Sequence, residues 1–372
     1  MTELEQYRAR IDELDRQMTA LFEQRMDVCK RVVQYKAQNG MEILQAGRED
    51  VVLQKARNNL KDQDYAEDIE EFYRQMMKIS RAIQAREMER MGVSKGETKP
   101  AVVGFQGVAG SFSEEALLMA FAPDQPRRNY PSFEEVFVAL KSGEIDYGVL
   151  PIENSSTGSI NAVYDLLMKY DFYIAQEVFV PVAQHLLALP AASLEDIREV
   201  YSHEQGFEQS RAFLAQHPGW KQIPYHNTAI SAQMVSQAGD VHKAAIASGR
   251  AAELYGLKIL RPTINTEKHN YTRFIIVAKV LQPQADANKI SMVFTLPNEP
   301  GALYGVLKEF AKGDINMLKL ESRPAPGKTW EYVFYADFEV AHGLSQAQPI
   351  VQALWGQGVA AKLIGAYKKQ NQ

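Results

Sequence analysis

Residues 4–35 read LEQYRARIDELDRQMTALFEQRMDVCKRVVQY, and this stretch predicts one long α-helix. Apolar side chains recur at the first and fourth positions of a seven-residue repeat, which is the pattern of a helix with a packed seam. The seam positions are Leu4, Tyr7, Ile11, Leu14, Met18, Leu21, Arg25, Val28, Val32 and Tyr35. Only Arg25 among them is polar and charged. A lone helix with such a seam needs a partner, so we expect it to pair with a second copy of the chain.

The pattern stays helical to about residue 91. Gly40 and Gly47 bracket a loop, and a second helix is expected from about Arg48 to Lys61. A polar turn at residues 62–64 precedes a third helix whose apolar side chains recur at helical spacing. We therefore expect an all-helical domain over residues 1–91, followed by a flexible linker over residues 92–100.

Residues 101–281 show a different pattern, in which short apolar runs alternate with helical runs. This alternation predicts parallel sheets covered by helices, and a possible crossover near residues 180–184 predicts two lobes with a cleft. Over residues 289–368 the order of elements is βαββαβ, the ferredoxin-like arrangement. The expected fold is thus multidomain: an all-α domain, a two-lobed α/β domain and an α+β domain.

Composition excludes several functional classes. The 372 residues carry a formal net charge of −5, spread evenly, which argues against nucleic acid or an anionic membrane as a partner. Cys29 is the only cysteine, so there is no disulfide framework or thiolate metal cluster. The first residues lack the apolar core of a signal peptide, and no apolar run reaches the length of a membrane span. We expect a cytoplasmic protein without a metal or cofactor.

Arg25 is the first candidate for a functional residue. Its stem could pack while its charged head reaches the surface, or it could bind an anion, since a buried unpaired guanidinium is costly. Lys36 lies nearly on the same helical face, roughly 16 Å along the axis, and could help to grip a small dianion. Arg48 and Glu49 open the second helix, and Ser80 and Gln84 share a face of the third. Arg8 lies about 25 Å from Arg25, too far for one small ligand, so it could serve a partner chain.

This set of residues resembles the active site of the all-helical chorismate mutases, which form intertwined dimers and use no cofactor. The resemblance implies rearrangement of chorismate to prephenate, a step that depends on orientation and charge placement. It implies that Arg8, Arg25 and Arg48 hold the dianion, and that Lys36 and Gln84 bind the ether oxygen. Glu49 would accept from the ring hydroxyl with support from Ser80, while Gln45 stands where some relatives carry an acidic residue.

Three polar segments mark the α/β region. Residues 104–113 form a glycine-rich turn whose Ser111-x-x-Glu114 is a capping box, an interpretation we favour over an anion site. Residues 151–160, PIENSSTGSI, place a carboxylate, an amide and four hydroxyls between a strand and a helix, more than an N-cap requires. Residues 270–274, NYTRF, open the last strand of the region. By itself Thr272 would be an ordinary strand residue.

Together with residues 201–205 and Gln209, these segments resemble the signature of prephenate dehydratases over about residues 101–281. The resemblance implies decarboxylation of prephenate with loss of the ring hydroxyl, giving phenylpyruvate. Thr272 would donate a hydrogen bond to the departing hydroxyl, and Arg273 would bind an anionic group of the substrate. Asn154, Ser202 and Gln209 would orient prephenate. Glu204 stands where relatives often have proline, and Glu153 is either a proton donor or a structural anchor.

The C-terminal region carries two further motifs. Residues 300–303, PGAL, lie at a strand-to-helix turn, and residues 321–324, ESRP, end the following strand. Each could be merely structural, but together they resemble the amino-acid-binding ACT domain. The resemblance implies L-phenylalanine as an effector. Its expected contacts are Gly301, Ala302, Leu303, Glu321, Ser322 and Arg323.

The sequence thus predicts a bifunctional chorismate mutase and prephenate dehydratase of phenylalanine biosynthesis, inhibited by L-phenylalanine and assembled as a homodimer or higher oligomer. One alternative is a non-catalytic ligand receptor, which the seam arginine and the absence of a signal peptide disfavour. A zinc or radical enzyme is disfavoured because the seven histidines are scattered. A third alternative, in which only the dehydratase is active, stays open.

Overall fold

The computed structural model describes residues 2–38, 48–90, 100–267, 269–325 and 331–370. The chain divides into two compact units, which we call the helical unit (residues 1–99) and the sheet unit (residues 100–372). The expected loop over residues 40–47 and almost all of the expected linker lie outside the described residues.

Helix α1 (Glu3–Gln38), α2 (Arg48–Asn58) and α3 (Ala66–Arg90) form the helical unit, with a short 3-10 turn at Gln63–Tyr65 before α3. The expected long first helix is confirmed, while α2 ends three residues earlier than expected. One face of α1 packs inside the chain, where Met26 and Val33 are buried together with Met76 and Met77 of α3. This packing gives the unit its small core.

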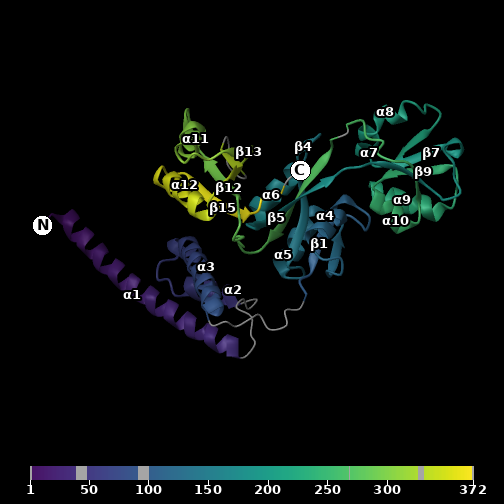
Figure 1. Ribbon diagram of the computed structural model, residues 1–372. Coiled ribbons are helices and arrows are strands. Elements are labelled where there is room, and N and C mark those ends of the chain that lie inside the picture. Colours follow the sequence, from purple (N-terminus) through teal and green to yellow (C-terminus); the bar gives the residue numbers. More distant parts are fainter. Residues whose placement is uncertain (1, 39–47, 91–99, 268, 326–330, 371–372) are drawn as a thin grey trace. The chain divides into compact units, whose positions relative to one another are not determined.

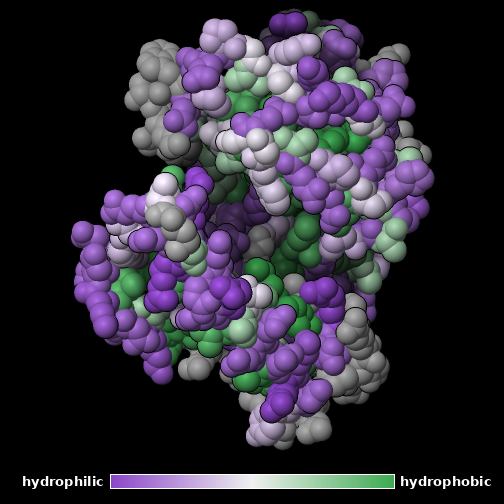
Figure 2. Space-filling view, turned by 90° about the vertical axis from the view of Figure 1, so that its left-hand side faces the viewer, coloured by the Kyte–Doolittle hydropathy of each residue, from purple (hydrophilic) through white to green (hydrophobic). Residues whose placement is uncertain are grey.

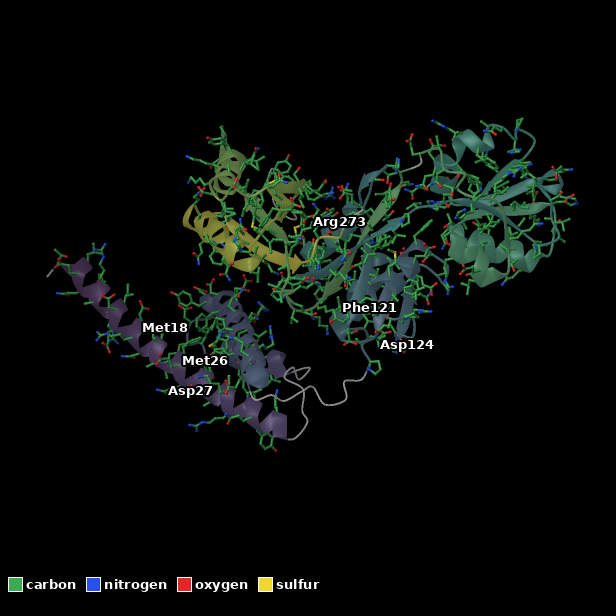
Figure 3. The ribbon with its side chains drawn as sticks, in the orientation of Figure 1. Met18, Met26, Asp27, Phe121, Asp124 and Arg273 are labelled. Atoms are coloured by element: carbon green, nitrogen blue, oxygen red, sulfur yellow. The ribbon has the colours of Figure 1, made fainter. Side chains whose placement is uncertain are left out.

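The predicted seam of α1 forms a second, exposed face. Tyr7, Leu21 and Tyr35 are each at least 60% exposed, and every other apolar seam residue is at least 42% exposed. Figure 3 labels one residue from each face: Met18 belongs to the seam, whereas Met26 is buried. An apolar face of this length, interrupted only by Arg25, is a surface that a partner would cover.

The sheet unit begins with a lobe formed around β1 (Val103–Gln106), β2 (Arg127–Tyr130) and β3 (Tyr147–Asn154), which pair in parallel. Helices α4 (Phe112–Ala120), α5 (Phe133–Ser142) and α6 (Asn161–Tyr170) cover this sheet. Strands β5 (Tyr173–Pro181) and β11 (Tyr271–Ala278) extend it, and β4 (Gly158–Ser159) pairs with β3. We call this part the first lobe.

The chain leaves the first lobe after β5 and returns at β11, and the segment between forms a second lobe with its own five-stranded sheet, ordered β10-β6-β9-β7-β8. Its strands are β6 (His185–Ala188), β7 (Glu199–Ser202), β8 (Lys221–Pro224), β9 (Lys243–Ala247) and β10 (Lys258–Arg261). Its helices are η2 (Leu194–Asp196), α7 (Glu204–Gln209), α8 (Arg211–Leu214), α9 (Thr228–Ala238) and α10 (Gly249–Tyr255).

The sheets of the two lobes are mixed, which corrects the expectation of parallel sheets. Strand β11 runs antiparallel to both β3 and β5, because the chain re-enters the first lobe from the second and inserts between them. In the second lobe, β6 runs antiparallel to both of its neighbours, β10 and β9. The crossover between lobes follows Pro181, inside the range expected from the sequence.

The C-terminal subdomain, as we call residues 289–367, has the predicted βαββαβ order. Its elements are β12 (Lys289–Leu296), α11 (Ala302–Lys312), β13 (Met317–Pro324), β14 (Tyr332–Glu339), α12 (Leu344–Gly356) and β15 (Ala360–Tyr367). The strand order β13-β14-β12-β15 is that of a ferredoxin-like sheet. The subdomain and the second lobe lie on opposite sides of the first lobe (Figure 1).

The C-terminal subdomain is joined to the first lobe by strand pairing, which the sequence did not indicate. Strand β15 lies parallel to β5, with Gly365 opposite Ile174, so that one ten-stranded sheet runs through both parts. A Cβ atom at Gly365 would come within 2.9 Å of the Ile174 carbonyl oxygen. The absence of a side chain at Gly365 therefore allows the two backbones to approach.

The surface is dominated by hydrophilic residues, which cover most of the face shown in Figure 2. Within the described part of the chain, none of the helices combines the length and the apolar character needed to cross a bilayer.

Candidate functional sites

Four predicted site residues of the helical unit lie on α1 and α3, two helices that pack against each other, and we refer to these four residues as the cluster. Lys36, Ser80 and Gln84 are buried, and Arg25 is half-buried. Gln84 Nε2 donates to Ser80 Oγ at 3.0 Å, and Ser80 Oγ in turn contacts Cys29 Sγ at 3.0 Å. Ser80 and Gln84 thus act as one hydrogen-bonded pair on the inner face of α3.

Two atoms of this cluster are buried without a hydrogen-bond partner among the described residues. They are Nη1 of Arg25 and Oε1 of Gln84. Buried polar atoms are rarely left unpaired, so such groups call for an explanation. The two groups are a guanidinium N–H donor and an amide oxygen acceptor, which are able to pair with an anionic group and with a hydroxyl, respectively.

The other predicted residues of the helical unit are placed differently. Arg8 is exposed on the N-terminal part of α1, well away from the cluster. Arg48 and Glu49 lie in the first turn of α2 as expected, but the positions of their side chains are not described. Gln45 lies outside the described residues.

In the sheet unit, the predicted polar segments meet where β3 ends and β11 begins. Thr272 lies directly opposite Asn154 in the antiparallel register. Asn154 Nδ2 donates to Thr272 Oγ1 at 3.0 Å and to Asn270 Oδ1 at 2.7 Å. Asn154 Oδ1 accepts from the backbone N–H groups of Ser156 and Thr157, which shapes the turn into β4. Asn154 is buried, whereas Thr272 is partly exposed.

Ser202 and Gln209 belong to the second lobe. Ser202 is fully buried at the end of β7, and its hydroxyl donates to the Ile246 carbonyl at 2.9 Å. Gln209 ends α7, and its Oε1 accepts from Gln184 Nε2 on the crossover segment at 3.0 Å. At the atypical Glu204, the turn is closed by His203, whose Nδ1 accepts from the Gln205 N–H.

The glycine-rich turn joins the two lobes. Ser111 caps α4 as expected, accepting from the Glu114 N–H, while the Glu114 carboxylate accepts from the Gly110 N–H at 2.7 Å. The Gly110 carbonyl accepts from Ser248 Oγ of the second lobe, and the Ala109 carbonyl accepts from the Tyr255 hydroxyl. The turn is therefore used for capping and for contact between lobes.

Arg273 occupies a position that the sequence analysis did not foresee. Instead of sharing the environment of Thr272, its guanidinium donates to Glu177 Oε2 at 2.8 Å, to Asp337 Oδ2 at 2.5 Å and to the Tyr367 hydroxyl at 3.0 Å. Adjacent side chains of a strand point to opposite faces, which explains the separation from Thr272. These contacts do not support the expected role of Arg273 as a ligand of prephenate.

The residues around Arg273 form a buried polar cluster that sequence reasoning missed. Lys289 Nζ donates to Glu177 Oε2 at 2.7 Å, and Ser291 Oγ donates to Asp337 Oδ1 at 2.5 Å. Burial opposes the charge of Arg273, but Asp337 and Glu177 raise the pKa of Arg273 well above its usual value. A usable signal was present, since a charged residue inside an apolar strand must be paired when it is buried.

The predicted effector residues fall on two elements of the C-terminal subdomain. Gly301 precedes α11 with a φ of 85°, a conformation that favours glycine, and Ala302 and Leu303 begin the helix. On β13, Ser322 is exposed, whereas Glu321 and Arg323 face the first lobe. Glu321 Oε2 accepts from Ser159 Oγ at 2.5 Å, and Arg323 forms two hydrogen bonds with the Asp165 carboxylate.

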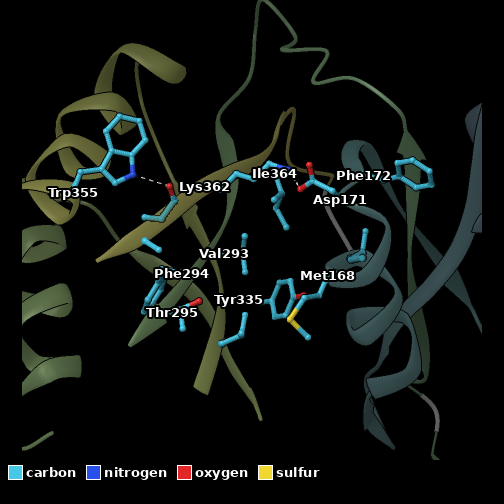
Figure 4. Close-up of a pocket in the computed structure, with 14 residues that line it drawn as sticks. Met168, Asp171, Phe172, Val293, Phe294, Thr295, Tyr335, Trp355, Lys362 and Ile364 are labelled. Carbon is cyan, nitrogen blue, oxygen red and sulfur yellow. Dashed lines mark hydrogen bonds and ion pairs between the residues drawn. The ribbon is translucent and has the colours of Figure 1, made fainter. Parts of the chain in front are cut away.

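A pocket of about 390 Å³ lies between the end of α6 and the C-terminal subdomain (Figure 4). Met168, Tyr335 and Trp355 contribute to its apolar wall, and Lys362 pairs with Asp171 at its edge. None of the predicted substrate or effector residues lines this pocket. Across the described ranges, no three His, Cys, Asp or Glu side chains are grouped so that they could hold a metal ion.

Comparison with known proteins assigns both units. The family model of chorismate mutase type II matches residues 7–85, and that of prephenate dehydratase matches residues 103–281. A bifunctional chorismate mutase/prephenate dehydratase from Escherichia coli (strain K12) is 32% identical over 73% of this chain and 72% of its own length. The chain belongs to the bifunctional chorismate mutase/prephenate dehydratase family. Its member from Aquifex aeolicus (strain VF5) is 29% identical over 99% of both chains.

Solved structures resemble this family member over 72% of its chain. The prephenate dehydratase from Arthrobacter aurescens, solved in complex with L-Phe, is 29% identical with a TM-score of 0.64, and 90% of that chain is covered. GqqA, described as a novel type of quorum quenching acylase, is 28% identical with a TM-score of 0.65, and 98% of that chain is covered. The enzyme is therefore a chorismate mutase and a prephenate dehydratase of phenylalanine biosynthesis.

Proposed function

We propose that the cluster of Arg25, Lys36, Ser80 and Gln84 is the chorismate site. Its support is the buried Nη1 of Arg25, a donor without a partner among the described residues. The rearrangement needs no acid, base or covalent intermediate, so its catalyst has to fold the dianion into a reactive shape and stabilise the developing charge. Arg25 and Arg48 would hold carboxylates of the ligand, and Arg8 of a second chain would complete the grip.

Lys36 and Gln84 would act on the ether oxygen whose bond to carbon breaks. The Gln84 amide has two N–H donors, and one of them is used by Ser80. The second can be donated to the ether oxygen while Lys36 supplies positive charge. Glu49 would accept from the ring hydroxyl, and Ser80 would keep the Gln84 amide in place. Gln45 is proposed as a further residue that binds chorismate.

The assembly that we propose is a dimer through the exposed seam of α1. The seam is apolar at every position except Arg25, and Arg8 lies beside it, far from the cluster in its own chain. A second copy lying along α1 would cover the seam and bring its Arg8 towards the first chain's cluster.

We propose that Thr272 assists departure of the ring hydroxyl from prephenate. The hydrogen bond from Asn154 Nδ2 to Thr272 Oγ1 supports this role more than any other contact. Because Thr272 Oγ1 accepts from Asn154, its own hydrogen is directed elsewhere and can be donated to the leaving hydroxide. Loss of carbon dioxide and aromatisation drive the step, so a well-placed donor is the main requirement.

The remaining predicted prephenate residues would act from the second lobe. The hydroxyl hydrogen of Ser202 is used by the Ile246 carbonyl, so Ser202 can offer prephenate only an acceptor. The Gln209 Oε1 accepts from Gln184, so Gln209 would use its amide N–H donors for prephenate. We propose that both residues orient the substrate when the lobes close.

L-phenylalanine is the proposed effector, bound by an ACT-like C-terminal subdomain. The ferredoxin-like order and the left-handed Gly301 before α11 are consistent with that assignment. The backbone at Gly301–Leu303 and the strand carrying Glu321, Ser322 and Arg323 would contact the amino acid. The solved relative in complex with L-Phe adds support.

The test of the proposed function is a single assay series. Purified protein receives chorismate without added metal or nucleotide, and prephenate and phenylpyruvate are followed over time. Formation of phenylpyruvate, with inhibition by added L-phenylalanine, is the expected result. Accumulation of prephenate without phenylpyruvate would contradict the proposed dehydratase activity. A failure to consume chorismate would contradict the proposed mutase activity.

A further inference from the structure

Next to the proposed catalytic pair, Asn154 and Thr272, each of the two strands carries a charged residue that contacts the C-terminal subdomain. Glu153 precedes Asn154 on β3, Arg273 follows Thr272 on β11, and the two lie opposite each other in the register. Arg273 Nη1 lies 3.9 Å from Glu153 Oε2. The backbone that positions the hydroxyl of Thr272 is thus flanked by a carboxylate and a guanidinium group.

The first of two contacts with the C-terminal subdomain is the cluster around Arg273. Arg273 and Lys289 face Glu177 and Asp337, so the buried charges balance. Glu177 belongs to the first lobe, while Lys289, Asp337 and Tyr367 belong to the C-terminal subdomain. The cavity beside Arg273 and Asp337 measures about 10 Å³, about the space that one water molecule needs. No substrate fits there, so the cluster holds the parts together.

The second contact runs through β13, the strand proposed to meet the effector. Lys319 Nζ lies 2.8 Å from Glu153 Oε1 and donates to Ser159 Oγ at 2.9 Å. Ser159 Oγ in turn donates to Glu321 Oε2. Lys319 and Glu321 are two residues apart on β13 and therefore lie on the same face of the strand. This face is turned to the segment that begins at Asn154. A shift of β13 would therefore move Glu153, the residue next to Asn154.

We propose that Glu153 and Arg273 are positioning residues that fix the Asn154–Thr272 pair to the C-terminal subdomain, and that L-phenylalanine changes dehydratase turnover through them. This inference rests on the proposed roles of Thr272 and of the effector strand. Glu153 and Arg273 contact side chains of the protein and act on the reaction through Asn154 and Thr272. An effector that prefers one arrangement of β13 shifts the placement of the Thr272 hydroxyl by this route.

The experiment compares Glu153→Gln, Lys319→Met and the double variant in the full-length enzyme with prephenate as substrate. We expect kcat to fall about tenfold with KM changed less than about twofold, because a small misplacement of the donor affects the chemical step more than binding. The concentration of L-phenylalanine for half-inhibition should rise about fivefold or more. The kcat of the double variant should be no lower than that of the more impaired single variant, since both substitutions remove the same Glu153–Lys319 ion pair.

Asp165→Asn is the matched control. Asp165 is also a carboxylate of the first lobe paired with a cation of β13, but it lies on α6 and pairs with Arg323 rather than Lys319. Its loss should leave uninhibited kcat unchanged. Arg273→Lys, checked for folding by thermal unfolding and circular dichroism, should behave like Glu153→Gln, because an ammonium group cannot make all three contacts of the guanidinium.

The proposal is overturned if Glu153→Gln and Lys319→Met keep normal kcat and normal inhibition. It is also overturned if the two effects multiply in the double variant, or if Asp165→Asn impairs kcat equally. Failure of the underlying function is distinguishable, because it would appear in the unmodified enzyme as no phenylpyruvate from prephenate or no response to L-phenylalanine.

Discussion

The two candidate sites of the enzyme differ in how their buried polar groups are paired. In the helical unit, Nη1 of Arg25 and Oε1 of Gln84 are buried without partners among the described residues, and the seam of α1 is exposed. In the first lobe of the sheet unit, Asn154 and Arg273 each make at least three hydrogen bonds within the same chain. The proposed mutase site thus keeps polar atoms that a ligand could pair with, whereas the proposed dehydratase site is organised by contacts within the chain.

If these proposed sites are correct, the difference matches what each reaction needs. A rearrangement of a flexible dianion gains from groups that become satisfied only when the ligand is bound. A dehydration that depends on one well-aimed hydroxyl gains from a donor whose orientation is fixed beforehand. The comparison predicts that substitutions in the helical unit act on ligand capture and assembly, and that those in the sheet unit act on turnover.

The largest expected effect is that of Arg25→Ala. Removing the guanidinium, whose Nη1 has no partner among the described residues, should lower mutase activity about 10³-fold, because the proposed charge-assisted contact with the dianion is lost. Dehydration of supplied prephenate should remain normal, since Thr272 lies in the other unit. Arg16→Ala removes an exposed cation of the same helix and serves as the control. Equal loss of both activities in a folded protein would contradict two independent sites.

Thr272→Ala should lower dehydratase kcat about 10²-fold with a smaller change in KM, because the donor acts mainly on the departing hydroxyl. Thr272→Ser retains the hydroxyl and should recover most of the rate. Chorismate should still be consumed by the alanine variant, so prephenate should accumulate in the coupled assay. Near-normal turnover of Thr272→Ala would remove Thr272 from the proposed site.

Mixing two inactive variants tests whether the mutase site is shared. If Arg8 serves the partner chain, heterodimers of Arg8→Ala and Arg25→Ala contain one site without either substitution. Random exchange of equal amounts should then restore about a quarter of the unmodified mutase activity, since half of the dimers are mixed and half of their sites are intact. Verified exchange without any recovery would place both arginines in one chain's site.

The smallest expected effect is at the effector turn. Gly301→Val places a side chain at a φ of 85°, which strains the backbone before α11 and should displace the proposed contact with L-phenylalanine. Half-inhibition should need about fivefold more L-phenylalanine, with uninhibited kcat unchanged. Isothermal titration should show correspondingly weaker binding. Full inhibition of this variant at the normal concentration would move the effector site away from Gly301.

Local patterns predicted much of the fold. The spacing of apolar residues indicated α1 and its seam, and the βαββαβ order of the C-terminal subdomain was readable from alternating runs. The sequence placed Asn154 and Thr272 in one site but did not predict their hydrogen bond. The two residues lie opposite each other only because β11 returns between β3 and β5.

Arg273 illustrates what the sequence did not reveal. Its hydrogen-bond partners are 64 to 96 residues away along the chain, and no local pattern links them. A motif places Arg273 beside Thr272, yet the alternation of strand side chains separates them. Side chains alternate between the two faces of a strand, and a charged residue inside an apolar strand needs a partner when it is buried. These two facts would have predicted a buried ion pair at Arg273, although not which residues form it.

The close approach of Gly365 to Ile174 has a consequence for any attempt to shorten the enzyme. A chain ending after β11 would lose β15 and leave the β5 edge, a largely apolar strand, open to pairing with other molecules. The same truncation would leave Glu177 and Arg273 without Lys289 and Asp337. A dehydratase fragment without its C-terminal subdomain should therefore aggregate unless the exposed edge is redesigned, for example with lysine or proline along β5.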